Sequence, residues 1–405
     1  MTPEVRDRID QIRQGIVPEG YKKTKSGILP ESWSVRTIAE CLERVEHPVE
    51  VQANEMYTQI GIRSHGKGLF YKEPVTGDSL GNKSVFWIEP DCFILNIVFA
   101  WEQAIGKTTQ AEAGMIGSHR FPMYRPINGS IDIDYLISYL LTKRGTDILE
   151  AASPGGAGRN RTLGQDRFMK SRIVLPPLDE QQKIAEILST QDKAIELQGR
   201  KIEELKRFKK GCLEKMFPRK GQKVPEKRFP GFTGDWEQRK LGDLLQTLPF
   251  KQFLKEPEPD GKYEIIQQGN EPVIGFANGT PCGDYKDVVI FGDHTLSLYK
   301  PQHPFFVATD GVRIVKGQQD TDGYYLLSLL ERYKPQSEGY KRYYSILADT
   351  NCITTYNTSE QEKIGVFFKL LDHLITLHQR KLEEMKKQKK ALMQLLLTGI
   401  VRVRL

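Results

Sequence analysis

Apolar residues recur every seven positions, with a second apolar series between them, in two separate stretches of the chain. This spacing is typical of helices that pair through a coiled-coil seam, although polar residues such as Gln198 and His378 interrupt it. Neither stretch contains proline, and both are rich in Lys, Glu, Gln and Leu, which favour helix. The apolar members of the predicted seam are Ile184, Leu188, Ile195, Ile202 and Leu205 in the first stretch, and Ile364, Phe368, Leu371, Ile375, Leu382 and Met385 in the second.

The two stretches are copies of one another. Residues 180–217 align on residues 360–397 without a gap, and 14 of the 38 aligned positions are identical. Two matching seams in one chain most simply pack on each other. A helix of this length spans about 57 Å at ~1.5 Å per residue, long enough to act as a strut.

The repetition extends beyond the helices. "WSVRTIAECL" from Trp33 resembles "WEQRKLGDLL" from Trp236, and "YLISYLL" from Tyr135 resembles "YLLSLLE" from Tyr325. The offset between copies changes from 203 to 190 to 180, which places the length differences inside the globular stretches. The chain is therefore predicted to be two copies of one α/β unit whose middles bind different things. A short helix after Pro3 is expected to complete the frame next to the second long helix, which makes the layout circular.

Length and composition set the class of protein. At 405 residues the chain is too long for one ordinary core, and it has neither an apolar run of roughly 18 residues nor a signal-peptide pattern, so we expect a cytoplasmic protein without a membrane partner. The five cysteines are far apart and are expected to be buried free thiols. Net charge is +7, and the excess lies in residues 206–240 and 380–405. Such basic stretches suit a polyanion partner, but they also occur as solvated helix faces.

The chain lacks the motifs of common enzymes. In "AIGKTTQ", Trp101 stands where a phosphate-binding loop needs glycine, and the seven histidines have no metal-ligand spacing. There is no adenine-methylase loop and no convincing nuclease pattern. We therefore predict a protein with no catalytic residues, no metal and no cofactor of its own.

Three segments resemble the specificity subunit of type I restriction–modification systems. They are "LPPLDEQQKIAEIL" from Leu175 with the "IEELKRFKKGCLEKMF" that follows, "FPGFTGDWEQRKLGDLL" from Phe229, and "KKALMQLLLTGIVRV" from Lys389. The resemblance covers the chain in order, but the second helix is entered by "TYNTSEQEKI" instead of a Pro-Pro segment. It implies a mixed α/β fold with two globular target-recognition domains separated by two long antiparallel coiled-coil helices, related by a pseudo-twofold repeat. The expected segments are a helical N-terminus over 1–20, a first domain over 21–176, a long helix over 177–218, a second domain over 219–358, and a last helix with its tail over 359–405.

The resemblance also implies a function. Each domain would read one half of a split target on double-stranded DNA, and the helices would fix the unread spacer and dock two methyltransferase subunits. Two restriction subunits, which are motor nucleases, would join them. S-adenosylmethionine, ATP and Mg²⁺ would then belong to the partners. A coiled-coil scaffold without DNA specificity is the alternative.

Polar and basic side chains in the two globular stretches are the candidate DNA contacts. Arg pairs bidentately with guanine and Gln or Asn with adenine, while Lys and Arg also bind phosphates. Any one of them can equally be an ordinary surface residue. The candidates are Arg63, His65, Lys67, Arg120, Arg125, Arg159 and Arg161 in the first stretch, and Gln267, Gln268, Asn270, Arg313, Lys341 and Arg342 in the second.

Overall fold

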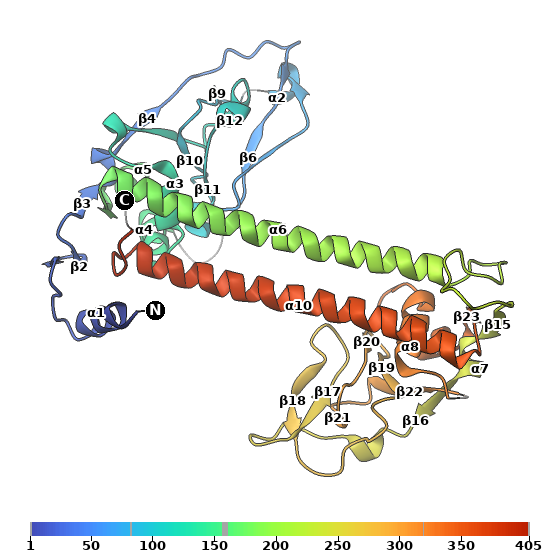
Figure 1. The fold of residues 1–405 in the computed structure, drawn as a ribbon. Coiled ribbons are helices and arrows are strands. Elements are labelled where there is room, and N and C mark those ends of the chain that lie inside the picture. The colour runs from blue at the N-terminus through green and yellow to red at the C-terminus, as the bar shows by residue number, and fades with distance from the viewer. Residues whose placement is uncertain (1, 82, 156–160, 319, 404–405) are drawn as a thin grey trace. The chain divides into compact units, whose positions relative to one another are not determined.

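The computed structural model describes residues 2–81, 83–155, 161–318 and 320–403. The chain forms two compact units. Unit 1 consists of residues 1–196 and 383–405, and unit 2 of residues 197–382. Each unit contains strands, short helices and part of both long helices (Figure 1).

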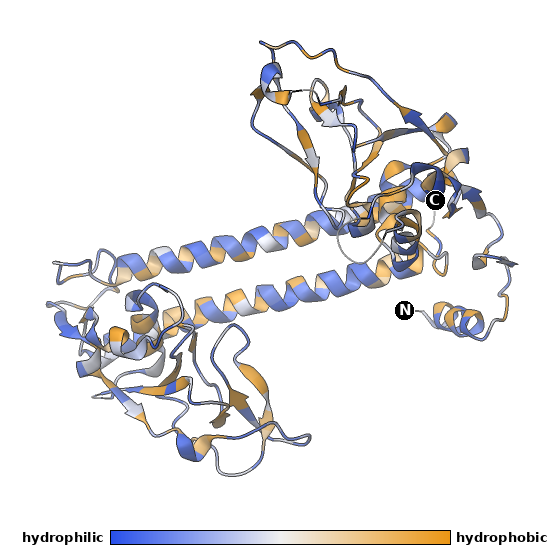
Figure 2. Ribbon diagram, turned by 180° about the vertical axis from the view of Figure 1, so that it is seen from behind, coloured by the Kyte–Doolittle hydropathy of each residue, from blue (hydrophilic) through white to orange (hydrophobic). Residues whose placement is uncertain are grey.

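The long helices are α6 (Leu178–Met216) and α10 (Thr358–Leu396), each of 39 residues. Within unit 1, Glu180 bonds Arg402 and Asp192 bonds Lys389, so the start of α6 lies beside the end of α10 and its tail. Within unit 2, Gln198 bonds His378 and Lys209 bonds Asp372. The helices therefore run antiparallel in each unit. Every predicted seam residue is buried or half-buried, as the seven-residue pattern predicts, and both helices mix hydrophilic and hydrophobic positions along their length (Figure 2).

Both units contain the same four-stranded sheet order. In unit 1 the order is β11-β10-β13-β4, and in unit 2 it is β20-β19-β22-β16, all antiparallel. A separate strand pair, β3 with β14 or β15 with β23, leads into the long helix in each unit. The bounds in unit 1 are β3 Ser34–Thr37, β4 Leu42–Val45, β10 Phe93–Leu95, β11 Ile105–Lys107, β13 Met123–Pro126 and β14 Arg172–Leu175. Those in unit 2 are β15 Glu237–Lys240, β16 Leu245–Leu248, β19 Val288–Gly292, β20 Leu298–Tyr299, β22 Val312–Gly317 and β23 Asn351–Thr354.

A matching helix also caps each sheet. Helix α3 (Ile133–Leu140) begins at the N-cap Asp132, and α8 (Gly323–Tyr333) begins at Asp322. Each aspartate accepts hydrogen bonds from backbone N–H groups of the first turn, which an N-cap must satisfy. The backbone N–H of each aspartate donates in turn to a glutamine one turn into the long helix, Gln181 or Gln361. The similar segments at Tyr135 and Tyr325 thus form equivalent helices, each capped by an aspartate that bonds to a glutamine of the long helix in its own unit.

The middles of the units differ. Unit 1 adds three two-stranded pairs, β5 with β8, β6 with β7 and β9 with β12, as well as helix α4. Unit 2 instead adds β17, which pairs antiparallel with β18 and parallel with β21. The bounds are β5 Met56–Tyr57, β6 Ile60–Ile62, β7 Leu69–Tyr71, β8 Val75–Thr76, α2 Gly77–Leu80, β9 Val85–Trp87, β12 Ile116–Ser118, α4 Lys143–Ala152, α5 Gln165–Lys170, β17 Tyr263–Ile266, β18 Val273–Ala277, β21 Phe305–Val307, α7 Leu241–Leu244 and α9 Tyr344–Asp349.

The two ends of the chain meet in unit 1. Helix α1 (Pro3–Arg13) precedes the hairpin of β1 (Tyr21–Thr24) and β2 (Gly27–Pro30). Arg8 donates to the carbonyl oxygen of Ile400 at 2.8 Å, and the Tyr21 hydroxyl donates to that of Gly399 at 2.7 Å. These bonds agree with the circular layout expected from the repeat. Within the described ranges, no helix has the length and apolarity needed to cross a bilayer.

Candidate nucleic-acid interface

Four loops of unit 2 meet beside the ends of β17, β19 and β22. They are residues 267–271, 293–297, 308–311 and 338–343, named here the recognition loops. The Gln268 side-chain oxygen accepts from the backbone N–H of His294 at 3.0 Å, and the backbone N–H of Asp293 donates to the carbonyl oxygen of Gly311 at 2.8 Å. A Cβ on Gly311 would lie too close to the Gln268 side-chain nitrogen, so any other residue there would displace the Gln268 amide.

Asp293 connects the recognition loops to each other. Its buried carboxylate accepts from the backbone N–H of Tyr344 at 2.8 Å and from Arg313 at 3.2 Å. Its carbonyl oxygen accepts from the backbone N–H of Tyr343 at 2.8 Å. A buried carboxylate with this many donors is fully satisfied, so it holds loop 338–343 rigidly against the sheet.

The six residues predicted as DNA contacts in unit 2 all lie on or next to the recognition loops. Asn270 and Arg342 are exposed, and Gln267 donates to Glu271 in its own turn. Lys341 pairs with Glu338 at 2.7 Å, and Arg342 with Asp310 at 3.8 Å. Gln268 and Arg313 are partly used inside the protein, as described above. The sequence did not single out Tyr340, His294 or Asp293, although "GYKRYY" places aromatic rings next to basic residues, which is a signal for nucleic-acid binding.

In unit 1, the predicted loop 63–68 joins β6 to β7. The backbone N–H groups of His65 and Gly66 donate to the carbonyl oxygens of Glu102 and Gln103 at 2.8 and 2.9 Å. Both donors adopt left-handed backbone conformations, with φ of +61° and +63°. The turn leaves Arg63, His65 and Lys67 exposed, with the Arg63 guanidinium 5.0 Å from the centroid of the Phe70 ring.

The remaining candidates of unit 1 are spread more widely. Arg161 lies over Trp101, 5.4 Å from the ring centroid, and so beside the turn that holds loop 63–68. Arg120 is exposed, and its carbonyl oxygen accepts from Ile97. Arg125 is on β13 and pairs with Glu89 at 3.6 Å. Arg159 lies outside the described residues. The contacts thus bring Arg161 to the loop of Arg63 and do not bring Arg125 there.

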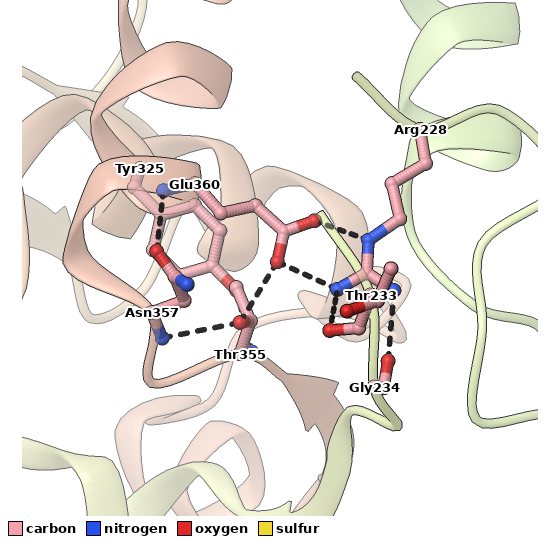
Figure 3. Close-up of polar contacts among 7 residues, drawn as sticks. All are labelled: Arg228, Thr233, Gly234, Tyr325, Thr355, Asn357 and Glu360. Atoms are coloured by element: carbon pink, nitrogen blue, oxygen red, sulfur yellow. Dashed lines mark hydrogen bonds and ion pairs between the residues drawn. The ribbon is translucent and has the colours of Figure 1, made fainter. Parts of the chain in front are cut away.

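A buried glutamate fixes the start of the long helix that supports each unit. In unit 2, Glu360 is 1% exposed and accepts from Arg228 at 2.7 and 2.9 Å and from the Thr355 hydroxyl at 3.0 Å (Figure 3). Arg228 also donates to the carbonyl oxygens of Gly234 and Thr233. The hydrogen bonds to Glu360 raise the pKa of Arg228 further above its usual value. Since Asn357 caps the same turn, α10 starts from a fixed point.

The corresponding glutamate of unit 1 is Glu180. It accepts from Arg402 at 2.6 and 2.7 Å and from the Trp33 indole N–H at 3.0 Å. We call the two sets the glutamate anchors. Sequence comparison finds the glutamates but not their arginines, because Arg228 and Arg402 lie outside the aligned stretches.

Two titratable groups of unit 2, Tyr325 and Lys300, are engaged in structural contacts. Burial raises the pKa of Tyr325, which keeps its phenol neutral beside Thr354, and burial lowers the pKa of Lys300 to about 8. Among the described residues, no three His, Cys, Asp or Glu side chains are placed to hold a metal ion. The arrangement displays polar and basic side chains on rigid loops, which is chemistry for binding.

Comparison with known proteins agrees with this geometry. Residues 84–207 match the family model for the type I restriction modification DNA specificity domain. The chain is 25% identical over 426 residues to the putative type I restriction enzyme MjaX specificity subunit of Methanocaldococcus jannaschii, covering 95% of this chain and 97% of the relative. It is 23% identical over 437 residues to the MjaVIII specificity subunit of the same organism, covering 97% and 98%.

Solved structures share the fold. The type I restriction–modification S subunit from M. genitalium superposes with a TM-score of 0.58 at 15% identity, covering 92% of this chain and 97% of that one. A chain from a study of complex assembly and conformational transition in the type I R-M system gives 0.56 at 14% identity, covering 92% and 99%. The predicted fold is confirmed, and over nearly its whole length the chain is similar to type I restriction–modification specificity subunits.

Proposed function

We propose that this chain is the non-catalytic DNA specificity subunit of a type I restriction–modification complex. The globular part of unit 1 reads one half of a bipartite target and that of unit 2 reads the other. One observation carries the proposal: the same sheet, capping helix and anchored long helix occur twice, and they carry two different sets of loops. Matching frames with different loops suit two readers with different sequences.

The partners in this proposal are double-stranded DNA and the methyltransferase and restriction subunits. S-adenosylmethionine, ATP and Mg²⁺ belong to those subunits. Helix α10 supports a docking role, because Val366, Leu370, Leu374 and Leu377 follow each other at helical spacing and are all at least 36% exposed. An exposed apolar stripe on one helix face suits a partner helix.

A genome-wide map of methylated adenines tests the function. Cells that express the methyltransferase partner are compared with and without this chain. We expect a split motif, with two short half-sites around a fixed gap, only when the chain is present. Replacing Arg63 and Lys67 together should then impair reading of one half-site and leave the other unchanged.

Two results would count against the proposal. If no motif depends on the chain while the partner is expressed and bound, a scaffold without DNA specificity becomes the better explanation. If the Arg63 and Lys67 replacements abolish both half-sites in a folded protein, the two readers are not independent.

A further inference from the structure

Tyr340 is displayed to solvent from loop 338–343. Its side chain is 87% exposed, the largest value among the exposed large apolar and aromatic side chains in the described part of the chain. A ring with so little burial contributes almost nothing to folding through the hydrophobic effect. Single exposed apolar residues are common, so the exposure matters only if the structure also fixes the ring in place.

The loop that carries Tyr340 is held on both sides. The buried Tyr343 hydroxyl donates to the carbonyl oxygen of Gly339 and accepts from the backbone N–H of Glu338, both at 2.7 Å. Gly339 has a φ of +101°, which other residues rarely adopt. Two hydrogen bonds and a turn that requires glycine therefore fix the backbone next to Tyr340, which lowers the entropy cost of using its ring in binding.

One face of the Tyr340 ring is partly overlapped by the ring of His294. The two rings are parallel, with 4.7 Å between centroids and 6° between planes. His294 is itself fixed, because its backbone N–H donates to Gln268 and its Nδ1 lies 3.2 Å from the carbonyl oxygen of Lys341. Insertion between two bases needs both faces of a ring, so the stack favours a contact through the ring edge.

The neighbours of Tyr340 suit a DNA groove. Lys341 and Arg342 follow it directly, and their ion pairs with Glu338 and Asp310 are exposed, so a phosphate can replace either carboxylate at little cost. The amides of Gln267 and Asn270 lie on an adjacent recognition loop and can read hydrogen-bonding groups. The apolar group that the major groove presents is the 5-methyl of thymine.

We infer that Tyr340 is a specificity-determining residue of unit 2 whose ring edge contacts the 5-methyl group of a thymine in the second half-site. The inference rests on the proposed function and adds the chemistry of one contact to it. It requires that the half-site read by unit 2 contain a thymine on at least one strand. A half-site of G·C pairs alone would overturn it.

The test measures DNA affinity of the complex of this chain with its methyltransferase subunits. Target duplexes carry uracil in place of each thymine in turn, which removes only the methyl group. For the wild-type complex we expect one position in the second half-site to weaken binding about 3- to 10-fold. Tyr340→Ala should weaken binding of the unmodified target by about 10-fold and be insensitive to uracil at that position. Tyr340→Phe should behave as wild type, because it keeps the ring edge.

A matched control is Phe276→Ala, which removes another exposed ring of unit 2, on β18, and should keep the uracil sensitivity. Three outcomes would overturn the inference: full uracil sensitivity in Tyr340→Ala, equal weakening on target and scrambled DNA, or a loss of methyltransferase assembly in place of DNA discrimination. Failure of the proposed function gives a different result, since the wild-type complex would then not distinguish target from scrambled DNA.

Discussion

The two glutamate anchors differ in where their arginines come from. In unit 2, Glu360 binds Arg228, which lies 132 residues earlier and follows the end of α6. In unit 1, Glu180 binds Arg402, which lies 222 residues later, in the tail after α10. The same bidentate contact is thus built once from the segment after α6 and once from the segment after α10.

The comparison shows that the same glutamate–arginine contact can form in both units although the arginine comes from a different part of the chain in each. The Arg228 side chain, in the segment between α6 and β15, is 13% exposed, whereas the Arg402 side chain, in the tail after α10, is 38% exposed. The second ligand of each glutamate differs too, Thr355 in unit 2 and the Trp33 indole in unit 1. The position of the carboxylate is common to both units, and the strength of its anchor is not.

Removing the arginines should produce the largest effect. Arg228→Met leaves Glu360 buried without its charged partner, and we expect unit 2 to lose about 3–5 kcal/mol of unfolding free energy. Arg402→Met should cost less, about 2–3 kcal/mol, because Trp33 still donates to Glu180 and the site is wetter. Denaturant unfolding followed separately in each unit measures both. Equal losses would show that the source of the arginine is irrelevant.

A second pair of variants compares the ion pairs on the helix seam. Lys209 forms ion pairs with Glu331 and Asp372, both at 2.6 Å, while Lys389 forms one with Asp192, at 2.5 Å. The Lys209 side chain is nearly buried and Asp192 is largely exposed. Lys209→Met should therefore destabilise unit 2 by about 2–3 kcal/mol, and Lys389→Met should cost unit 1 about 0–1 kcal/mol. A larger loss for Lys389→Met in the same unfolding experiment would contradict this ranking.

The two buried tryptophans give a smaller contrast. Trp33 Nε1 donates to Glu180 at 3.0 Å, whereas Trp236 Nε1 is buried and has no hydrogen-bond partner among the described residues. Trp33→Phe removes a bond to a charged group, and Trp236→Phe removes an unsatisfied donor. We expect Trp33→Phe to cost about 1–2 kcal/mol more than Trp236→Phe in thermal or denaturant unfolding. If Trp236→Phe is the more damaging, shape complementarity outweighs hydrogen bonding at these sites.

The smallest expected effect is a pH dependence confined to unit 2. Burial raises the pKa of Glu331, and Lys209 lowers it less than burial raises it. An acid with a raised folded pKa binds more protons when folded, so unit 2 gains stability as pH falls through that raised pKa toward the ordinary glutamate value. Glu331→Gln should remove this gain. The difference between wild-type and variant unfolding curves from pH 7 to pH 4 isolates it, and parallel curves would exclude Glu331 as its source.

The sequence predicts the pairing of the two long helices well because their copies align at a constant offset of 180 residues. Asp192 and Asp372, like Lys209 and Lys389, recur at the offset of 180, so both seam ion pairs follow once the helices are antiparallel. The anchor arginines could not be predicted this way. Arg228 and Arg402 are 174 positions apart, and their contacts depend on where the loops and chain ends return.

The recognition loops were only partly predictable for a similar reason. Residue type alone pointed to Arg313 and Lys341, but only the fold shows that Arg313 is paired with buried Asp293. Tyr340 could not be ranked above the other tyrosines, because its exposure and its stack on His294 depend on contacts between loops far apart in sequence.

The closure of unit 1 by the tail sets an order of events during synthesis. Unit 2 is one continuous stretch, but unit 1 needs residues 383–405, which leave the ribosome only after all of unit 2. Unit 1 therefore begins first but is completed after unit 2. Glu180 lacks its arginine partner during a wait of 222 residues of translation, more than half the length of the sequence. At roughly 5–20 residues per second, that wait lasts on the order of 10–45 s. During it Glu180 can accept the Trp33 indole N–H but lacks the cation that neutralises its charge in the folded unit.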